Sequence, residues 1–480
     1  MGDVALEGGF YKAKSLIAGA QACTNLYPEK NQKGAPFPWT YYQRPGNELA
    51  LTGPGAAARC QYRATNGQMF EVLGTAVYYT DSTPARHLLG TIAAGSTQCS
   101  MADNGTVLVL VDGTSAGYVI NLGTHVMTTI SDPAFYGSTR VEYMDTYFIF
   151  NRPGTTQWYL SPQNWNGTDP FDALDIANKV GGADLLQCAA ANAGNILLIG
   201  TLTTEVWYNA AGADFVFARV PSVFIEHGTP APYSVVQNDV GTYLLSQDDD
   251  GGSIIAKIVG YNFQRISTHA IENVLGSYST LADCVARTYQ MEGHAFASFT
   301  FPTGDGTWVW DEGSQLWHEE TWCDDDGIEH RHRAQCGTYA YGINWMSDWE
   351  NGNLYIADFG TFEDQGAVNH PIVFRKGFQH LVKGGKRVSY TKLIAAMQAA
   401  AVSGGLTDDE QFVSLRFSDT KGYSWSDPVT DGVGSTGDHG KQITFWQLGL
   451  AADRVFELFW SAPYQTALMG AFIDAEPAET

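Results

Sequence analysis

The stretch that decides the fold class is Thr307-Trp308-Val309-Trp310-Asp311-Glu312-Gly313-Ser314-Gln315-Leu316-Trp317-His318. Large apolar side chains alternate along it as far as Trp310, a polar turn follows at residues 312–314, and Trp317 lies on the return. Alternation with a period of two, interrupted by a short glycine-bearing turn, predicts a β-hairpin. We expect its tryptophans to fill the gaps between packed sheets rather than to form a ligand platform.

The same pattern of two short strands around a polar or glycine-bearing turn recurs along the chain. The pairs lie at 107–111 with 118–121, 147–150 with 157–160, 196–199 with 205–208, 243–245 with 254–258, 295–299 with 307–310, and 354–357 with 372–374. They begin about 40 to 60 residues apart, which is the period of a four-stranded propeller blade once two weaker strands are added to each pair. The spacing predicts a β-propeller of about six blades. A further pair, 70–73 with 77–79, is either another blade or the strand that closes the ring.

The composition also favours an all-β protein. The 52 glycines and the charged share of only 16% suit short strands joined by tight turns and argue against helix bundles. No stretch approaches the roughly 20 apolar residues of a membrane-spanning helix, and the N-terminus lacks a secretory signal, so we expect a soluble, unprocessed protein without a membrane anchor. The seven scattered cysteines include no CxxC pair, which predicts reduced thiols and folding in a cytoplasm.

The net charge excludes one class of function. The chain has 27 Lys and Arg against 51 Asp and Glu, which makes its formal charge −24. Affinity for nucleic acid comes mainly from clustered Lys and Arg that displace counterions from phosphates. The sequence therefore excludes a broad nucleic-acid-binding face, and we expect the protein to repel DNA.

The repeating pattern ends near a small basic cluster at residues 383–387. We divide the chain into an N-terminal segment over residues 1–60, a propeller over residues 61–385 and a C-terminal β-sandwich-like module over residues 386–480. Strands are expected in the module at 412–417, 443–448, 455–460 and 467–473. Residues 392–402 are rich in Ala, Leu and Met and are predicted as a helix by propensity, with a long strand as the alternative.

Several residue groups resemble cofactor or metal sites without the required context. Gly432, Gly434 and Gly437 spell GxGxxG, but an alternating, strand-like segment follows where a dinucleotide site needs a helix. A zinc ligand set is present in Cys323, His330, His332 and Cys336. Its spacing does not match the paired tight turns of zinc sites, and we expect a polar hairpin loop instead. We predict no catalytic residue, no bound cofactor and no metal.

Two acidic turns are the candidate channel or loop residues. They comprise Asp248, Asp249 and Asp250, and Asp324, Asp325 and Asp326. Neither turn has the alternate-position oxygens and distal glutamate of a calcium loop, so we expect solvated turn tips.

One segment leaves an enzymatic alternative open. Residues Ser418-Asp419-Thr420-Lys421-Gly422-Tyr423-Ser424-Trp425 approximate the Asp-box, Ser-x-Asp-x-Gly-x-x-Trp, with the acid one position early. This hairpin occurs in sialidase propellers and other β-proteins, where it is structural. Glycosidases need two opposed carboxylates, or a tyrosine nucleophile with arginine clamps in sialidases, and the sequence identifies no converging pair. A propeller glycosidase or a glycan-binding protein is therefore the alternative function.

Segments at both ends of the chain resemble the packaged-DNA stabilisation, or tail nozzle, proteins of short-tailed bacteriophages. The C-terminal ones are Leu415-Arg416-Phe417-Ser418-Asp419, Gly422-Tyr423-Ser424-Trp425-Ser426, Gly434-Ser435-Thr436-Gly437-Asp438-His439-Gly440-Lys441, Asp453-Arg454-Val455-Phe456 and Gly470-Ala471-Phe472-Ile473-Asp474. The N-terminal ones are Thr24-Asn25-Leu26-Tyr27-Pro28-Glu29 and Leu51-Thr52-Gly53-Pro54-Gly55. Between them, Trp317-His318-Glu319-Glu320 and Ser347-Asp348-Trp349-Glu350-Asn351-Gly352-Asn353-Leu354-Tyr355 are similar to blades of that family. The resemblance marks Ser418, Gly422, Trp425, Gly434, Gly437, Asp438 and Gly440 as a structural motif.

The resemblance implies a virion component of the phage tail, assembled in the bacterial cytoplasm. It implies a homohexameric ring below the portal and adaptor rings that closes the channel after packaging and opens it for ejection. Its implied partners are further copies of the chain, the adaptor, tail fibres or tailspikes, and a tail needle or plug, while DNA passes through without specific binding. We expect residues 1–60 and the C-terminal module to make the ring and adaptor contacts, because variable blade-tip loops suit fibre docking.

Overall fold

The computed structural model of the chain describes residues 2–4, 6–212, 214–247, 251–382, 384–398, 411–433 and 441–478. Within those ranges nearly all regular structure is β-strand, as the composition predicts. The exceptions there are one short α-helix, α1 (His269–Leu275), and one 3-10 turn, η1 (Pro232–Ser234). No helix of the described ranges is both long and apolar enough to cross a bilayer.

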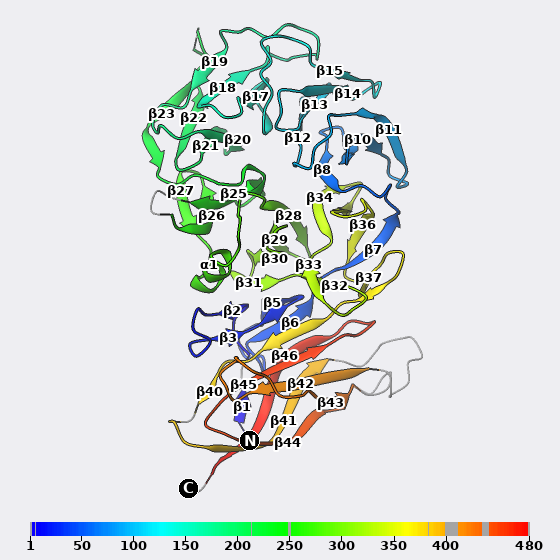
Figure 1. Cartoon of the computed structure of the whole chain (residues 1–480), viewed down its shortest axis with the longest axis vertical. Coiled ribbons are helices and arrows are strands. Elements are labelled where there is room, and N and C mark those ends of the chain that lie inside the picture. Colours follow the sequence, from blue (N-terminus) through cyan, green and yellow to red (C-terminus); the bar gives the residue numbers. More distant parts are fainter. Residues whose placement is uncertain are drawn as a thin grey trace.

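Seven antiparallel four-stranded blades surround a common axis and form a β-propeller (Figure 1); five are separate sheets, and two are parts of larger sheets. The first four blades consist of β8 (Ala58–Arg63), β9 (Met69–Leu73), β10 (Ala76–Thr80) and β11 (Arg86–Thr91); β12 (Ser100–Asp103), β13 (Val107–Val111), β14 (Gly117–Asn121) and β15 (Met127–Thr129); β16 (Val141–Met144), β17 (Tyr147–Asn151), β18 (Gln157–Leu160) and β19 (Ile176–Asn178); and β20 (Leu186–Asn192), β21 (Asn195–Gly200), β22 (Thr204–Asn209) and β23 (Phe217–Ile225). The other three consist of β24 (Val236–Gln237), β25 (Thr242–Gln247), β26 (Ser253–Val259) and β27 (Asn262–Arg265); β28 (Val285–Met291), β29 (His294–Phe301), β30 (Gly306–Asp311) and β31 (Leu316–Glu319); and β34 (Ala334–Ala340), β35 (Ile343–Asp348), β36 (Leu354–Asp358) and β7 (Gly46–Leu51).

The hairpin that decides the fold class is the second half of the sixth blade. Strands β30 and β31 pair with Trp310 opposite Trp317, and both indoles are buried, which confirms their packing role. Glu312 in the intervening turn accepts a hydrogen bond from Tyr243 (3.0 Å) and lies 2.5 Å from Lys257, both on the fifth blade. The same turn therefore also fastens neighbouring blades together.

The ring has one blade more than the hairpin period indicates. Residues 70–73 and 77–79 belong to β9 and β10, so they are the middle of a full blade and not a closing strand. The predicted pairing of 354–357 with 372–374 is wrong. Strand β36 pairs with β35 and β7, whereas Phe374 begins β39 (Phe374–Gly377), which pairs with β45 (Asp453–Trp460) outside the ring.

Ring closure comes from the N-terminal part of the chain. Strand β7 runs antiparallel to β36 and completes the seventh blade, more than 300 residues away in sequence. The register is held by Arg44, whose guanidinium donates to Asp364 (2.6 Å) and to the Asn25 side chain (2.9 Å). Asn47 in β7 donates to the other Asp364 oxygen at 2.7 Å. Since the Arg44 and Asp364 side chains are only 1% and 2% exposed, this ion pair closes the ring in a largely water-free environment.

A second β-module lies beside the fifth, sixth and seventh blades (Figure 1). One of its sheets has the order β44 (Ile443–Ala451), β41 (Val388–Gln398), β46 (Ala467–Pro477), β6 (Trp39–Gln43) and β5 (Leu26–Lys30), and β1 (Gly2–Val4) also pairs with β46. The other contains β39, β45, β42 (Phe412–Ser418) and β43 (Val429–Gly432), with β40 (Leu381–Val382) also on β45. It continues through β4 (Cys23–Thr24) into β31 of the sixth blade. The module therefore takes strands from both ends of the chain.

The helix predicted at residues 392–402 is wrong over its described part. Residues 392–398 belong to β41, which pairs with β44 on one side and β46 on the other. Its buried Leu393 and its small Ala395 fit the crowded face of a central strand. Pairing on both edges overrides the helical propensity, which amounts to only a few tenths of a kcal/mol per residue.

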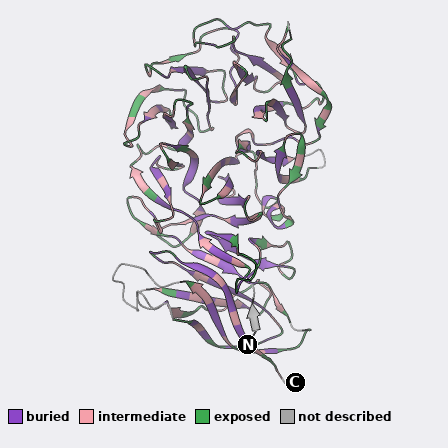
Figure 2. Ribbon diagram, turned by 180° about the vertical axis from the view of Figure 1, so that it is seen from behind, coloured by how far each residue is buried: buried purple, intermediate pink, exposed green. Residues whose placement is uncertain are grey.

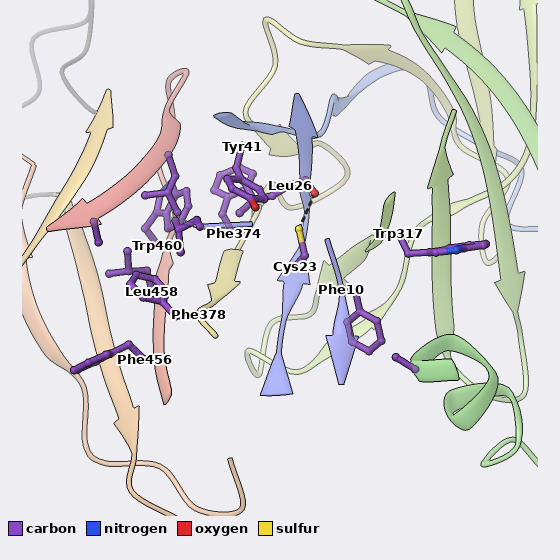
Figure 3. Close-up of a cluster of buried hydrophobic side chains, with 14 of the residues drawn as sticks. Phe10, Cys23, Leu26, Tyr41, Trp317, Phe374, Phe378, Phe456, Leu458 and Trp460 are labelled. Carbon is purple, nitrogen blue, oxygen red and sulfur yellow. Dashed lines mark hydrogen bonds between the residues drawn. The ribbon is translucent and has the colours of Figure 1, made fainter. Parts of the chain in front are cut away.

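One hydrophobic cluster joins the propeller to the module. It extends from Trp317 in the sixth blade through Phe10, Cys23, Leu26 and Tyr41 to Phe374, Phe378, Phe456, Leu458 and Trp460 (Figure 3). Buried residues concentrate along the strands of both parts and across their junction, whereas exposed residues collect on outer strands and turns (Figure 2). The two parts therefore share a core. Two further short hairpins consist of β2 (Tyr11–Lys12) with β3 (Ala20–Gln21) and of β37 (Glu363–Asp364) with β38 (His370–Pro371).

We expect Arg44→Ala to lower the free energy of unfolding by about 3–5 kcal/mol, because it leaves the Asp364 carboxylate buried without its cation. Urea denaturation followed by tryptophan fluorescence measures the change. Arg265→Ala removes an arginine from a half-exposed ion pair with Glu272 and serves as the control, with an expected loss of about 1 kcal/mol or less. Equal losses in the two variants would show that Arg44 has no special role in closure.

Candidate functional site

The acids singled out from the sequence lie on an outer hairpin or outside the described residues. Asp324, Asp325 and Asp326 form the turn between β32 (Thr321–Cys323) and β33 (Glu329–Arg331). The Asp324 carboxylate accepts the backbone amides of Asp326 (3.0 Å) and Ile328 (2.8 Å), so this side chain shapes its own turn. Asp325, at 80% exposure, extends into solvent. Asp248, Asp249 and Asp250 lie outside the described residues.

The same hairpin contains His330, one of the four residues of the zinc ligand set seen in the sequence. The His330 ring lies between Asp305 (2.8 Å) and Asp324 (3.2 Å), and the hydrogen bond to Asp305 raises the pKa of His330. Cys336 lies on β34 at the propeller axis, away from this hairpin. Among the described residues no three His, Cys, Asp or Glu side chains are grouped closely enough to hold a metal ion.

The Asp-box-like segment forms a hairpin turn after β42. Ser418 Oγ accepts the backbone amide of Gly422 at 2.7 Å, and Gly422 has a φ of +97°, which favours glycine. The buried Arg454 guanidinium donates from Nε and Nη2 to the two Asp419 carboxylate oxygens, at 2.6 and 2.7 Å. Trp425 packs against the Arg416 guanidinium, 4.8 Å from ring centre to charge. The described hydrogen bonds and the cation–ring contact of this motif are internal to the module, while Gly434, Gly437, Asp438 and Gly440 lie outside the described residues.

Three of the acids buried in the blades are bound to cations. Asp348 accepts Arg333 at 2.7 Å, Glu71 accepts Arg86 at 2.9 Å, and Asp311 accepts the His294 ring at 2.9 Å. A glycosidase requires two carboxylates that face one substrate across a few ångströms. These acids instead accept hydrogen bonds from the cationic side chains of nearby chain segments, which stabilises the blades.

The propeller axis contains a cavity of about 910 Å³ that the sequence analysis did not identify. It is lined by the innermost strands β8, β12, β16, β24, β28 and β34, with Tyr233 and Val235 of the η1 segment. Four arginines line it, Arg59, Arg63, Arg140 and Arg287, against one carboxylate, Glu142. Burial raises the pKa of Glu142, with Arg140 opposing the shift. No sequence signal marks these positions, because they are brought together only when the ring closes.

Seven four-stranded blades around this cavity, with the last blade completed from the N-terminus, define a ring-closed β-propeller carrying a fused β-module. A family model described as "Bacteriophage P22 Gp10, beta-propeller" matches residues 20–362, well over half of the chain. The chain belongs to this phage stabilisation family, and the resemblance identified from the sequence is confirmed. It is accordingly a phage structural protein.

Several solved structures have a weaker likeness to the chain. The WD40 β-propeller domain of Doa1 has a TM-score of 0.38 at 11% identity and covers 65% of this chain and 96% of its own. The computationally designed Ika8 protein has a TM-score of 0.37 at 10% identity, covering 65% and 100%. The extracellular domain of the one-component system BT4673 from B. thetaiotaomicron has a TM-score of 0.44 at 8% identity, covering 82% and 49%. No curated protein sequence matches the chain.

The ion pair of the partly buried His294 with the buried Asp311 makes stability depend on pH. The hydrogen bond to Asp311 raises the pKa of His294 above the value of about 6.5 that it has in an unfolded chain. The pair therefore contributes its full stabilisation below about pH 6.5 and loses it as the pH rises through the raised pKa of the folded state.

We expect the free energy of unfolding of the wild type to fall between pH 6 and pH 9 by more than that of Asp311→Asn, in urea titrations at each pH. His269→Gln, at a histidine that is 81% exposed, is the control and should keep the wild-type pH dependence. An Asp311→Asn protein with an unchanged pH profile would contradict this assignment.

Proposed function

We propose that the protein is the tail nozzle of a short-tailed phage. In this role six copies form a ring below the portal and its adaptor, close the channel after packaging, retain the DNA and conduct it during ejection. The family match over residues 20–362 is the observation that carries the proposal. The nozzle needs no catalytic site, since its task is to hold a shape and to present a charge.

The distribution of charge supports a conduit. Nine basic and nine acidic side chains are buried among the described residues, so the buried charges cancel. The whole net charge of −24 then belongs to half-buried or exposed residues and to residues outside the described ranges. Six such protomers around a channel repel the DNA phosphates wherever their acids face the bore. DNA passes without adhering, and retention comes from a constriction or from a plugging partner such as a tail needle.

The module is the part of the protomer that we assign to ring and adaptor contacts. It carries exposed apolar side chains at Trp446 (57%) and Leu450 (51%), both on β44, at the edge of its sheet. Phe412 and Val429, on β42 and β43, are exposed as well. Exposed apolar residues at a sheet edge are suited to a protein interface, and a ring closes when such contacts are heterologous. The blade-tip turns remain free for tail fibres or tailspikes.

The glycosidase and glycan-binding alternatives receive no specific support from the described residues. The acid of the Asp-box-like hairpin, Asp419, is bound to Arg454 through both carboxylate oxygens. Trp345 of the seventh blade is 1% exposed, so its indole cannot stack on a glycan.

We expect the purified protein, mixed with adaptor rings, to form a complex that contains six copies of the 52.2 kDa chain for each ring. Mass photometry gives the stoichiometry, and electron microscopy of the mixture should show a six-fold ring on the adaptor. A protein that stays monomeric and does not bind the adaptor would refute the proposal. Release of reducing ends from host polysaccharide would favour the glycosidase instead.

We expect Trp446→Asp combined with Leu450→Asp to abolish ring formation on the adaptor while the monomer stays folded, because the charges occupy exposed apolar positions of the module. The matched control is Leu88→Asp combined with Val126→Asp, which places the same charges on exposed apolar positions of the blades. Loss of ring formation in the control, or its retention in the module variant, would move the interface away from β44.

A further inference from the structure

We propose that the axial cavity of the propeller binds a small tetrahedral oxyanion, of which inorganic phosphate is the simplest example, between Arg59 and Arg287. Such a site goes beyond the nozzle function, because it lies inside a single protomer and needs no ring. It rests on the position, burial and partners of the cavity arginines.

Three of the four cavity arginines gather at one end of the cavity, and Arg63 lies at the other. The innermost strands of a propeller all run in the same direction along the axis, so residues at their starts lie at the same end. Arg59 is the second residue of β8, Arg287 is the third of β28, and Arg140 directly precedes β16. In the ring, β34 lies between β28 and β8, and a Cβ on its Gly337 would lie 3.5 Å from Arg287 Cδ. Arg59 and Arg287 therefore flank the same strand.

Arg59 carries a buried charge without a counterion. Its side chain donates from Nε to the Thr97 carbonyl (2.6 Å) and from Nη1 to the Gly74 carbonyl (3.0 Å). The residue is 3% exposed, and none of the described carboxylates lies within ion-pair distance of it. A buried ion that lacks a partner of opposite charge is strongly unfavourable, so this guanidinium favours an anion in the adjoining cavity.

Arg287 offers a donor that the described protein atoms leave unused. The residue is 7% exposed, and its Nε has no hydrogen-bond partner. Its Nη2 lies 3.5 Å from Glu320, which also accepts the Tyr289 hydroxyl at 2.8 Å. Because a buried donor without an acceptor is unfavourable, the free Nε is a second reason for an acceptor to occupy the cavity.

The other groups that line the cavity do not provide a counterion for Arg59. Arg140 is matched by Glu142 at 3.2 Å and donates to the carbonyls of Pro232 and Val235. Three cysteines, Cys60, Cys99 and Cys336, also line the cavity. Burial raises the pKa of the Cys99 thiol to about 12 and raises those of the other two, so they remain neutral thiols. The positive charge of Arg59 therefore stays uncompensated.

An anion can enter from solvent. The opposite end of the cavity is lined by the exposed residues Arg63, Gln237, Gln290 and Tyr339. Arg63 adds a positive charge at that entrance. The cavity volume of about 910 Å³ leaves room for the ion together with water.

The test is a titration of the full-length protein with inorganic phosphate at constant ionic strength, followed by calorimetry and by the broadening of the 31P resonance. We expect saturable binding to the wild type, competition by sulfate, and affinity reduced about tenfold or more in Arg59→Gln and in Arg287→Gln, since each loses a charge-assisted hydrogen bond. Arg265→Gln, outside the cavity, is the control and should bind as the wild type does. Absence of saturable binding, or equal binding by the cavity variants and the wild type, would overturn the proposal.

A second measurement covers the case in which a cavity variant does not fold. Crystals of the wild type grown with selenate reveal the position of the anion by its anomalous scattering. A peak between Arg59 and Arg287 is the expected result. Selenate peaks confined to the outer surface would mean an adventitious ion only, and the site would be rejected.

Discussion

Closure of the ring by β7 is the constraint on which the rest of the structure depends. A blade has two apolar faces and is stable only between neighbours, so an open ring would leave blade faces and a sheet edge in water. The chain supplies the missing strand from residues 46–51 and holds it with the Arg44–Asp364 ion pair and Asn47. Because β7 must reach the last blade, the residues before it are placed against the sixth and seventh blades, where β4, β5 and β6 join the module sheets.

This arrangement couples the two parts of the protein mechanically. Strand β4 bridges β31 of the propeller and β39 of the module, and the same hydrophobic cluster fills both. Opening the seventh blade would therefore disturb the module, and displacement of the module would strain the closure. In the proposed nozzle, this coupling distributes mechanical load over the paired strands that join the two parts. Buried Lys and Arg equal buried Asp and Glu in number among the described residues, so the large negative charge belongs to the less buried residues and to those outside the described ranges.

Pairings between neighbouring strands were predicted from the sequence, whereas pairings between distant strands were not. Six hairpins are read from alternation and turn residues, and five of them have the expected partners, since a hairpin is specified by contacts between neighbours in sequence. The sixth, which joins 354–357 to 372–374, is wrong because the true partner of β36 is β7, about 300 residues away. The helix expected at residues 392–402 is wrong for a similar reason, since β41 is paired on both edges. The acids at residues 324–326 lie in a turn, as the sequence predicts. The arginines of the axial cavity, by contrast, belong to no local sequence pattern.

The sequence by itself determined the all-β class, the blade hairpins, the acidic character and the family, because these depend on composition, on a period of two and on short motifs. Only the tertiary structure decided the number of blades, the strand that closes them, the sharing of the module between both ends of the chain and the basic lining of the axis. Those features require residues from distant blades to meet, and the free energy that selects such pairings comes from burial and ion pairing in the closed ring rather than from local preference.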